Sequence, residues 1–304
     1  MQKINMGPSV PFFSSKGADG PRAAIFLSGS GTNAERILES WRAAARPPFS
    51  PVVLVTDAPR TSRACELGTT FGLPVVENDI RQYYRDRGES RFSLATAEGR
   101  KIRREWTDSL RRQLAEFDID FGILAGFMPL TNITGDFPCL NVHPGDLTYE
   151  KDGRRWLVGL HTLPVERAIL EGLESMRSSV IVAQPYEAAG DNMDSGPILG
   201  LSGPVPIDWQ GCTLEALREC ARQRPANKPK GGFNDRLQWL AEHNLERLKV
   251  KGDWKVFPRV VFDFAAGRFA RGPEEELFFA VGGRMQPVRT VVYSEGGREI
   301  VFRQ

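Results

Sequence analysis

Short runs of consecutive apolar residues, each followed by a turn and a segment with helical spacing, constrain this chain more than any other feature. The first run covers residues 23–27, and the turn at 28–33 leads to Ile37, Leu38 and Trp41 at helical spacing. The alternation recurs, with strands predicted at 52–55, 73–76, 119–125, 139–142 and 178–183 and helices at 62–69, 98–117 and 163–170. Continuously apolar strands that alternate with helices are typical of a parallel sheet covered on both faces. We therefore predict a doubly wound, mostly parallel α/β fold.

Three parts of the chain depart from this pattern. Residues 1–22 contain three prolines and almost no periodicity, so we expect a loose N-terminal leader outside the fold. Residues 209–240 are charged and mostly of helical character, which predicts a helical insertion. Residues 270–304 alternate apolar and polar residues around two Gly-Gly turns, which predicts a short C-terminal segment of antiparallel strands.

Composition narrows the function classes. Hydrophobic residues make up 41% and charged residues 26% of the 304, which is the globular range. The net charge of +2 indicates no broad basic surface, so we expect neither a nucleic-acid nor a membrane partner. No apolar run approaches the roughly 20 residues that span a bilayer, and no signal peptide is evident, so we expect a cytoplasmic protein. The four cysteines fit neither a metal knuckle nor a disulfide framework.

The turn at residues 29–33, with the sequence GSGTN, lies between the first predicted strand and helix. Glycines let the backbone turn sharply there, and the free N–H groups of the following helix favour an anion. The turn matches neither GxGxxG nor a P-loop with its lysine, so the dinucleotide and nucleoside-triphosphate interpretations are weak. A phosphate site and a tight connection without a ligand both remain open.

Asn141 and His143 lie at the end of a predicted strand, where open α/β sheets place ligands. Side chains two apart on a strand share a face, so both can reach one substrate. Their N–H donors suit an oxyanion that develops on an acyl carbon, but a hydrogen-bonded strand-end histidine is the plainer interpretation. Asp194 stands in a Gly/Pro turn, where it is either a catalytic carboxylate or a turn-forming residue.

Taken together, six short motifs carry a resemblance to a known family. The motifs are LSGSGTN (27–33), LAGFM (124–128), NVHP (141–144), GLHT (159–162), MDSGPIL (193–199) and VFPRVVFDFAAGRF (256–269). In this order they resemble the folate-dependent formyltransferases, and among these the branch that formylates glycinamide ribonucleotide in purine biosynthesis. The resemblance implies a Rossmann-like formyltransferase fold over residues 23–304, since all these motifs must meet at one cleft.

By this resemblance, Asn141, His143 and Asp194 match the catalytic asparagine, histidine and aspartate of the family. The implied reaction passes the formyl group of 10-formyltetrahydrofolate, the co-substrate, to the amine of glycinamide ribonucleotide. A protonated His143 and Asn141 would stabilise the oxyanion, and Asp194 would raise the pKa of the histidine and help to move protons. No metal is required. His161 matches a supporting histidine beside the aspartate, although an ordinary loop histidine explains it equally well.

The resemblance also implies the two substrate pockets. The 5′-phosphate would be bound by the turn residues Gly29, Ser30, Gly31, Thr32 and Asn33. Asp253 matches a glutamate that holds the ribose hydroxyls, but its side chain is one methylene shorter. The folate pocket would include Phe127, Met128 and Asp191. The partners expected are therefore small molecules, and the sequence allows a homodimer.

Three departures from the family lie around these pockets. A polar insertion at 149–155 follows His143, Pro129 stands where an arginine is usual, and extra residues follow Ile207. The acceptor is therefore open, and the alternatives are another small amine, such as an amino sugar nucleotide, or water, which would make the protein a 10-formyltetrahydrofolate hydrolase. A non-catalytic nucleotide-binding module is the alternative from a different class.

Overall fold

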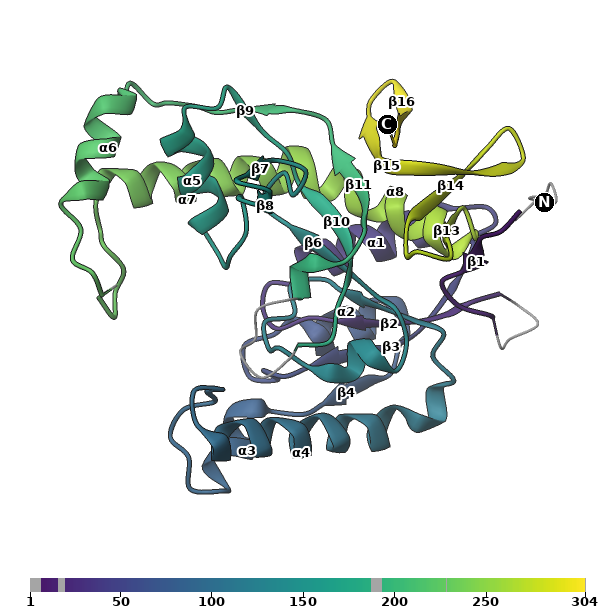
Figure 1. Cartoon of the computed structure of the whole chain (residues 1–304). Helices are drawn as coiled ribbons and strands as arrows, with labels where there is room; N and C mark the ends of the chain where they lie inside the picture. The colour runs from purple at the N-terminus through teal and green to yellow at the C-terminus, as the bar shows by residue number, and fades with distance from the viewer. Residues whose placement is uncertain (1–6, 16–19, 187–192, 228, 304) are drawn as a thin grey trace.

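The computed structural model describes residues 7–15, 20–186, 193–227 and 229–303. One twelve-stranded sheet in this part of the chain has the order β1-β13-β14-β15-β11-β10-β6-β5-β2-β3-β4, with β16 paired to β15 (Figure 1). Its strands are β1 (Val10–Pro11), β2 (Arg22–Phe26), β3 (Ser50–Thr56), β4 (Val75–Glu77), β5 (Phe121–Leu124), β6 (Cys139–His143), β10 (Ser179–Ala183), β11 (Ile198–Ser202), β13 (Phe269–Arg271), β14 (Leu277–Val281), β15 (Arg284–Ser294) and β16 (Gly297–Phe302). Strands β6, β5, β2, β3 and β4 run parallel, and β10 runs antiparallel to both of its neighbours.

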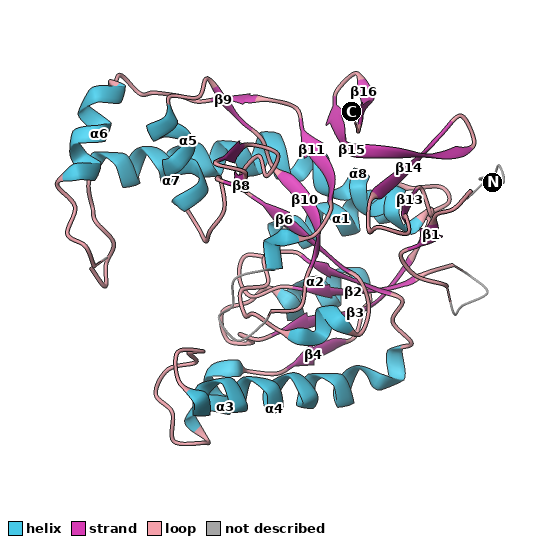
Figure 2. Ribbon diagram, viewed as in Figure 1, coloured by secondary structure: helices cyan, strands magenta, loops and turns pink. Residues whose placement is uncertain are grey.

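Helices cover both faces of the parallel part of the sheet (Figure 2). One face packs against α1 (Thr32–Ala43), α2 (Ala64–Phe71) and α8 (Trp254–Ala265), and the other against α3 (Ile80–Arg85) and α4 (Ala97–Leu114). The spacing of the apolar residues on α4 explains its position, because Ile102, Trp106 and Leu110 are all fully buried. The predicted doubly wound, mostly parallel α/β fold is confirmed.

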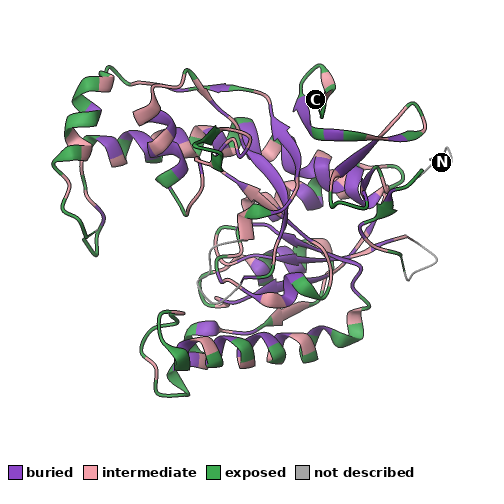
Figure 3. Ribbon diagram, viewed as in Figure 1, coloured by how far each residue is buried: buried purple, intermediate pink, exposed green. Residues whose placement is uncertain are grey.

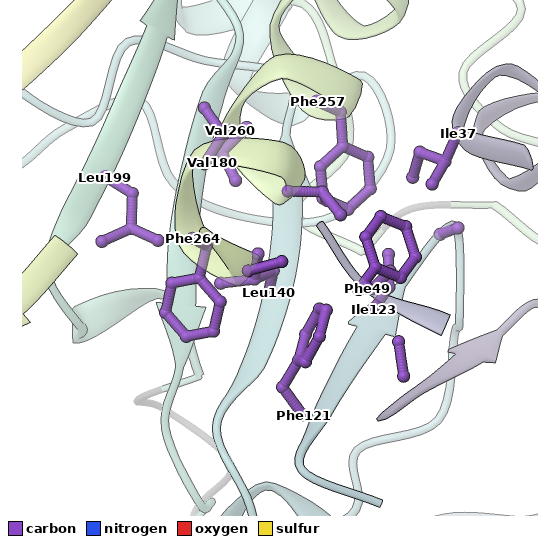
Figure 4. Close-up of a cluster of buried hydrophobic side chains, with 14 of the residues drawn as sticks. Ile37, Phe49, Phe121, Ile123, Leu140, Val180, Leu199, Phe257, Val260 and Phe264 are labelled. Carbon is purple, nitrogen blue, oxygen red and sulfur yellow. The ribbon is translucent and has the colours of Figure 1, made fainter. Parts of the chain in front are cut away.

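The main core lies between the sheet and α8. Figure 4 shows Phe121 and Leu140 from the strands facing Phe257 and Phe264 from the helix. Each such side chain contributes about 1.5–3 kcal/mol when it is fully removed from water. Burial is concentrated in the strands and in the helix faces that touch them (Figure 3). This core holds the carboxyl ends of β2, β5 and β6 in fixed positions.

Part of the expected loose leader belongs to the fold. Strand β1 pairs with β13 at the edge of the sheet. Phe12 is 7% exposed and its ring centroid lies 5.3 Å from that of Phe264, while Phe13 stacks on Phe121 at 5.5 Å. The expectation of a leader outside the fold is therefore wrong for residues 10–13. Periodicity could not reveal a two-residue strand whose proline is tolerated only at a sheet edge.

The C-terminal strands are antiparallel hairpins, but they do not form a separate unit. Gly282 and Gly283 both have positive φ, 57° and 79°, as a two-residue turn between β14 and β15 requires. Strand β15 then pairs parallel with β11. The C-terminal segment thereby extends the central sheet.

Three helices, α5 (Leu163–Glu171), α6 (Leu214–Arg222) and α7 (Arg236–Leu248), project from the sheet at the left of Figure 1 around a small apolar cluster of their own. Arg224 joins them through ion pairs to Glu166 (2.5 Å) and Asp235 (2.7 Å). The residues 209–240 thus include the helices that the sequence predicts. A π-helical turn, Lys249–Asp253, continues α7 directly into α8. No helix in the described ranges combines the length and the apolar composition needed to cross a membrane.

Candidate active site

The central feature of the site is a buried histidine paired with a carboxylate. His143 ends β6 and is only 3% exposed. Its Nε2 donates to the carbonyl oxygen of Leu157 at 2.7 Å, because a carbonyl can only accept. Its Nδ1 lies 3.5 Å from Oδ2 of Asp194. The ring is therefore fixed on one side by the backbone, while its other nitrogen faces the aspartate.

The pKa of His143 depends on its burial and on two charged neighbours. Burial lowers the pKa of the imidazole below its usual 6.5, and the positive charge of Arg155 lowers this pKa further. The Asp194 carboxylate and the Leu157 carbonyl favour the charged form but do not outweigh burial. The lowered pKa favours a neutral His143 ring in the protein without substrate, and the protonated His143 that the resemblance implies for the reaction stays a prediction. The neutral ring offers the Nδ1 lone pair as a proton acceptor.

Asn141 lies on the same strand and the same face as His143, as its spacing predicts. Its neighbours across the ladders are Leu124 and Ile181, which fix its backbone in the middle of the sheet. The half-buried Asn141 amide makes no hydrogen bond to another described residue. Asp194 comes from the short 3₁₀ turn Met193–Ser195, which leads into β11.

The GSGTN turn lies at the carboxyl end of β2, which is separated from β6 by the single strand β5. Gly31 caps α1 in the left-handed conformation with φ 63°. A Cβ at this position would stand 2.9 Å from Leu27 and 3.0 Å from Leu67, so only glycine fits. A cavity of about 250 Å³ opens on the turn, and Gly126, Met128 and Lys249 complete its wall. The N–H groups at the start of α1 and the lysine make this cavity suitable for an anion.

Asp253 lies next to this turn, on the π-helical turn between α7 and α8. Its Oδ1 accepts a hydrogen bond from Ser178 Oγ at 2.5 Å, and its Oδ2 accepts one from Asn33 Nδ2 at 3.4 Å. Burial raises the pKa of its carboxyl to about 6. The adjacent Ser179 pairs with His143 in the ladder between β10 and β6. A continuous series of contacts thus links the GSGTN turn to the histidine pair.

The side-chain carbonyl oxygen of Asn33 is buried without a partner among the described residues. While its Nδ2 donates to Asp253, its Oδ1 is buried without a hydrogen-bond partner in the described structure. A buried acceptor without a donor is costly, and a ligand that donates a hydrogen bond would satisfy it. This atom lies beside the wall of the anion cavity.

No model of a known protein family matches the sequence, and no curated protein matches it. Solved structures do match the fold. Glycinamide ribonucleotide transformylase 1 from Symbiobacterium toebii superposes with a TM-score of 0.53 at 22% identity, covering 89% of this chain and 95% of that one.

Two further structures agree with this match. Phosphoribosylglycinamide formyltransferase from Anaplasma phagocytophilum has a TM-score of 0.57 at 15% identity, over 90% of this chain and 98% of that one. The enzyme of the same name from Coxiella burnetii has a TM-score of 0.56 at 18% identity, over 90% and 99% of the two chains. This chain has the phosphoribosylglycinamide formyltransferase fold. The resemblance stated from the six motifs is confirmed at the level of the fold.

Within this formyltransferase fold, the residues expected around folate have different environments. The half-buried Phe127 ring packs edge-on against Phe26 at 5.4 Å and stacks on Trp106 at 6.3 Å. Met128 is 47% exposed and lines the cavity at the GSGTN turn. Asp191 lies outside the described residues. The folate contacts of these residues stay predictions.

His161 is exposed in the loop before α5, with φ 56°. It makes no hydrogen bond to His143 or Asp194 among the described contacts. Its supporting role stays a prediction. In the described ranges, no group of three or more His, Cys, Asp and Glu side chains could hold a metal ion.

Two charged residues at the site are absent from the sequence-based prediction. Lys249 lines the anion cavity from the π-helical turn, while its Nζ pairs with Glu246 at 3.1 Å. Arg155 comes from a small hairpin, β7 (Glu150–Lys151) and β8 (Arg154–Arg155), and donates to the backbone of the Asp194 turn. Lys249 precedes Asp253 by four residues, a spacing that could have drawn attention to it. No comparable signal marks Arg155.

Proposed function

We propose that the chain transfers the formyl group of 10-formyltetrahydrofolate to the amine of glycinamide ribonucleotide. The observation that carries the proposal is the buried His143 with its Nδ1 facing Asp194, two residues from the Asn141 amide on the same strand face. Acyl transfer to an amine needs a proton acceptor and an oxyanion donor on one side of the reacting carbon. The formyltransferase fold supports the same chemistry.

The Asn141 amide and the Nδ1 atom of His143 have separate roles in this reaction. The neutral amine attacks the formyl carbon, which gives a tetrahedral intermediate with a negative oxygen and a positive nitrogen. Asn141 donates an N–H to the oxygen. His143 Nδ1 accepts a proton from the nitrogen, and the imidazolium formed is stabilised by Asp194 at 3.5 Å. Return of this proton to the departing folate nitrogen accompanies collapse to the formamide and tetrahydrofolate.

The acceptor assignment depends on the anion cavity. The backbone N–H groups at Gly31, Thr32 and Asn33 would bind the 5′-phosphate, together with the Lys249 ammonium group. Asp253 is engaged by Ser178 and Asn33, so we assign it the positioning of Asn33 in addition to any contact with the ribose. The unsatisfied Asn33 Oδ1 would then accept from a ribose hydroxyl.

The test is turnover of 10-formyltetrahydrofolate by the purified full-length chain with three acceptors. Glycinamide ribonucleotide, an amino sugar nucleotide and water alone are compared, and tetrahydrofolate and the formylated product are both quantified. We expect glycinamide ribonucleotide to give the highest kcat/KM with one formamide formed per tetrahydrofolate. Faster turnover of the amino sugar nucleotide would overturn the assignment of the acceptor. Turnover that needs only water would overturn the assignment as a transferase.

A further inference from the structure

The polar insertion after His143 forms a hairpin that approaches the catalytic pair. Strands β7 and β8 bring Arg155 inward while the preceding Arg154 stays exposed. Arg155 is half-buried, and burial lowers the pKa of its guanidinium group. A buried cation is costly unless its donors are satisfied, so the contacts it makes indicate what it is for.

Those contacts are to the turn that carries Asp194. Arg155 Nη1 donates to the backbone carbonyl of Asp194, and Nη2 donates to the carbonyl of Gly196 at 2.9 Å. A planar guanidinium group that binds two carbonyls of one turn fixes the turn in position and orientation. Because the contact is to the backbone, the Asp194 carboxylate remains free to face His143.

The same segment also fixes the histidine. Two residues after Arg155, the Leu157 carbonyl accepts the His143 Nε2 hydrogen bond. This stretch is itself held by Arg167 of α5, which donates to the carbonyls of Trp156 at 2.7 Å and Val158 at 3.0 Å. One short strap, residues 155–158, therefore contacts both members of the pair.

We propose that Arg155 is a positioning residue, which acts through Asp194 by holding the turn 193–196 at the distance from His143 that proton transfer needs. The inference rests on the proposed function for its kinetic consequences, but the positioning itself is a property of the protein without substrate. The ionisable groups that act on the His143 ring among the described residues are Asp194 and Arg155. A change in the Asp194 position must therefore alter the titration of His143.

The main test is Arg155→Lys. Lysine keeps the positive charge but lacks the planar pair of N–H donors with which a guanidinium group binds both carbonyls. We expect kcat to fall about 10-fold with KM values changed less than 2-fold, because misplacement of a proton-transfer group affects the reaction step. The matched control is Arg154→Lys on the same strand, which we expect to leave both constants unchanged. Thermal unfolding of both variants checks that the fold is intact.

A second measurement is independent of activity. The chain has three histidines, so NMR titration of their ring signals can follow His143 directly. In Arg155→Lys, we expect its pKa to fall below the wild-type value, toward that of Asp194→Asn, since a loosened carboxylate stabilises the imidazolium less. An unchanged His143 pKa in Arg155→Lys would overturn the proposal, because the Asp194 carboxylate would then keep its position without the two guanidinium hydrogen bonds.

The double variant separates action through Asp194 from a general structural role. In an Asp194→Asn background, Arg155→Lys should reduce kcat by less than 2-fold, because the group it positions is already gone. A full 10-fold loss in that background would also overturn the proposal. If the wild-type chain transfers formyl groups to no acceptor, the proposed function fails, while the NMR titration still decides the role of Arg155.

Discussion

The two ends of the candidate site, one at β6 and one at β2, are built from different chemical groups. At β6, the groups are the side chains of His143 and Asp194, to which the proposed mechanism assigns proton transfer. Burial lowers the pKa of His143. At β2, the anion cavity is made mainly of backbone N–H groups around Gly31, with Lys249 as its cation. We therefore expect substitutions at the β6 end to alter the reaction step and its pH dependence. Substitutions at the second should alter binding.

The strongest test of this contrast is His143→Ala. We expect kcat to fall by about 10²–10⁴ while KM for both substrates changes little, since the residue supplies proton transfer. Steady-state kinetics with saturating folate measure both constants. Because the pKa of His143 is lowered, the acid limb of the wild-type rate profile should be centred below the usual histidine value of 6.5.

The matched control is His243→Ala, because this histidine lies on α7 and contacts Asp208, Gln210 and Trp239 rather than residues of the candidate site. A loss in His143→Ala that appears entirely in KM would contradict the division of roles. An acid limb of the kcat profile centred above pH 7 would contradict the neutral histidine.

Asp253 connects the two ends, and its pKa predicts an effect on stability. Burial raises the pKa of this carboxyl from its usual 3.8 to about 6 in the folded chain. Protonated Asp253 therefore stabilises the folded chain fully below about pH 4. This stabilisation is lost as the pH rises through 6, which lowers the free energy of unfolding by up to about 3 kcal/mol. Urea unfolding of wild type and Asp253→Asn across pH 4–7 measures this loss.

The comparison of wild type and Asp253→Asn is essential, since the lowered pKa of His143 has the opposite effect on stability in an overlapping pH range. We expect the wild type to lose stability relative to Asp253→Asn as pH rises from 4 to 7. A constant difference between the two proteins would show that Asp253 does not titrate in this range.

The sequence predicted the parts of the site that depend on local order. Residues 23–33 and 139–143 combine a buried strand with a turn or a strand end, so their positions in a parallel sheet follow from the pattern itself. Asn141 and His143 share a face for the same reason. These predictions needed no knowledge of distant contacts.

The remaining features depend on contacts between distant segments. The hairpin strands β7 and β8 have two residues each, too few for any periodicity. Arg155 and Lys249 are two of 40 lysines and arginines, and only the folded chain distinguishes them from solvated surface charges. The pKa of His143 likewise depends on how completely the surrounding elements exclude water, which spacing does not reveal.

The smallest expected effect belongs to Lys249→Met, which removes the cation from the anion cavity but keeps the length of the side chain. We expect KM for the phosphorylated acceptor to rise about 10-fold with kcat within 2-fold, because an ammonium–phosphate contact contributes about 1–2 kcal/mol to binding. The wild-type KM should also rise with salt concentration, and this dependence should weaken in the variant. Lys251→Met, two residues along the same turn and outside the lining of this cavity, is the matched control. If Lys249→Met instead lowered kcat and left KM and its salt dependence unchanged, the lysine would belong to the reacting end of the candidate site, and the division between the two ends would be wrong.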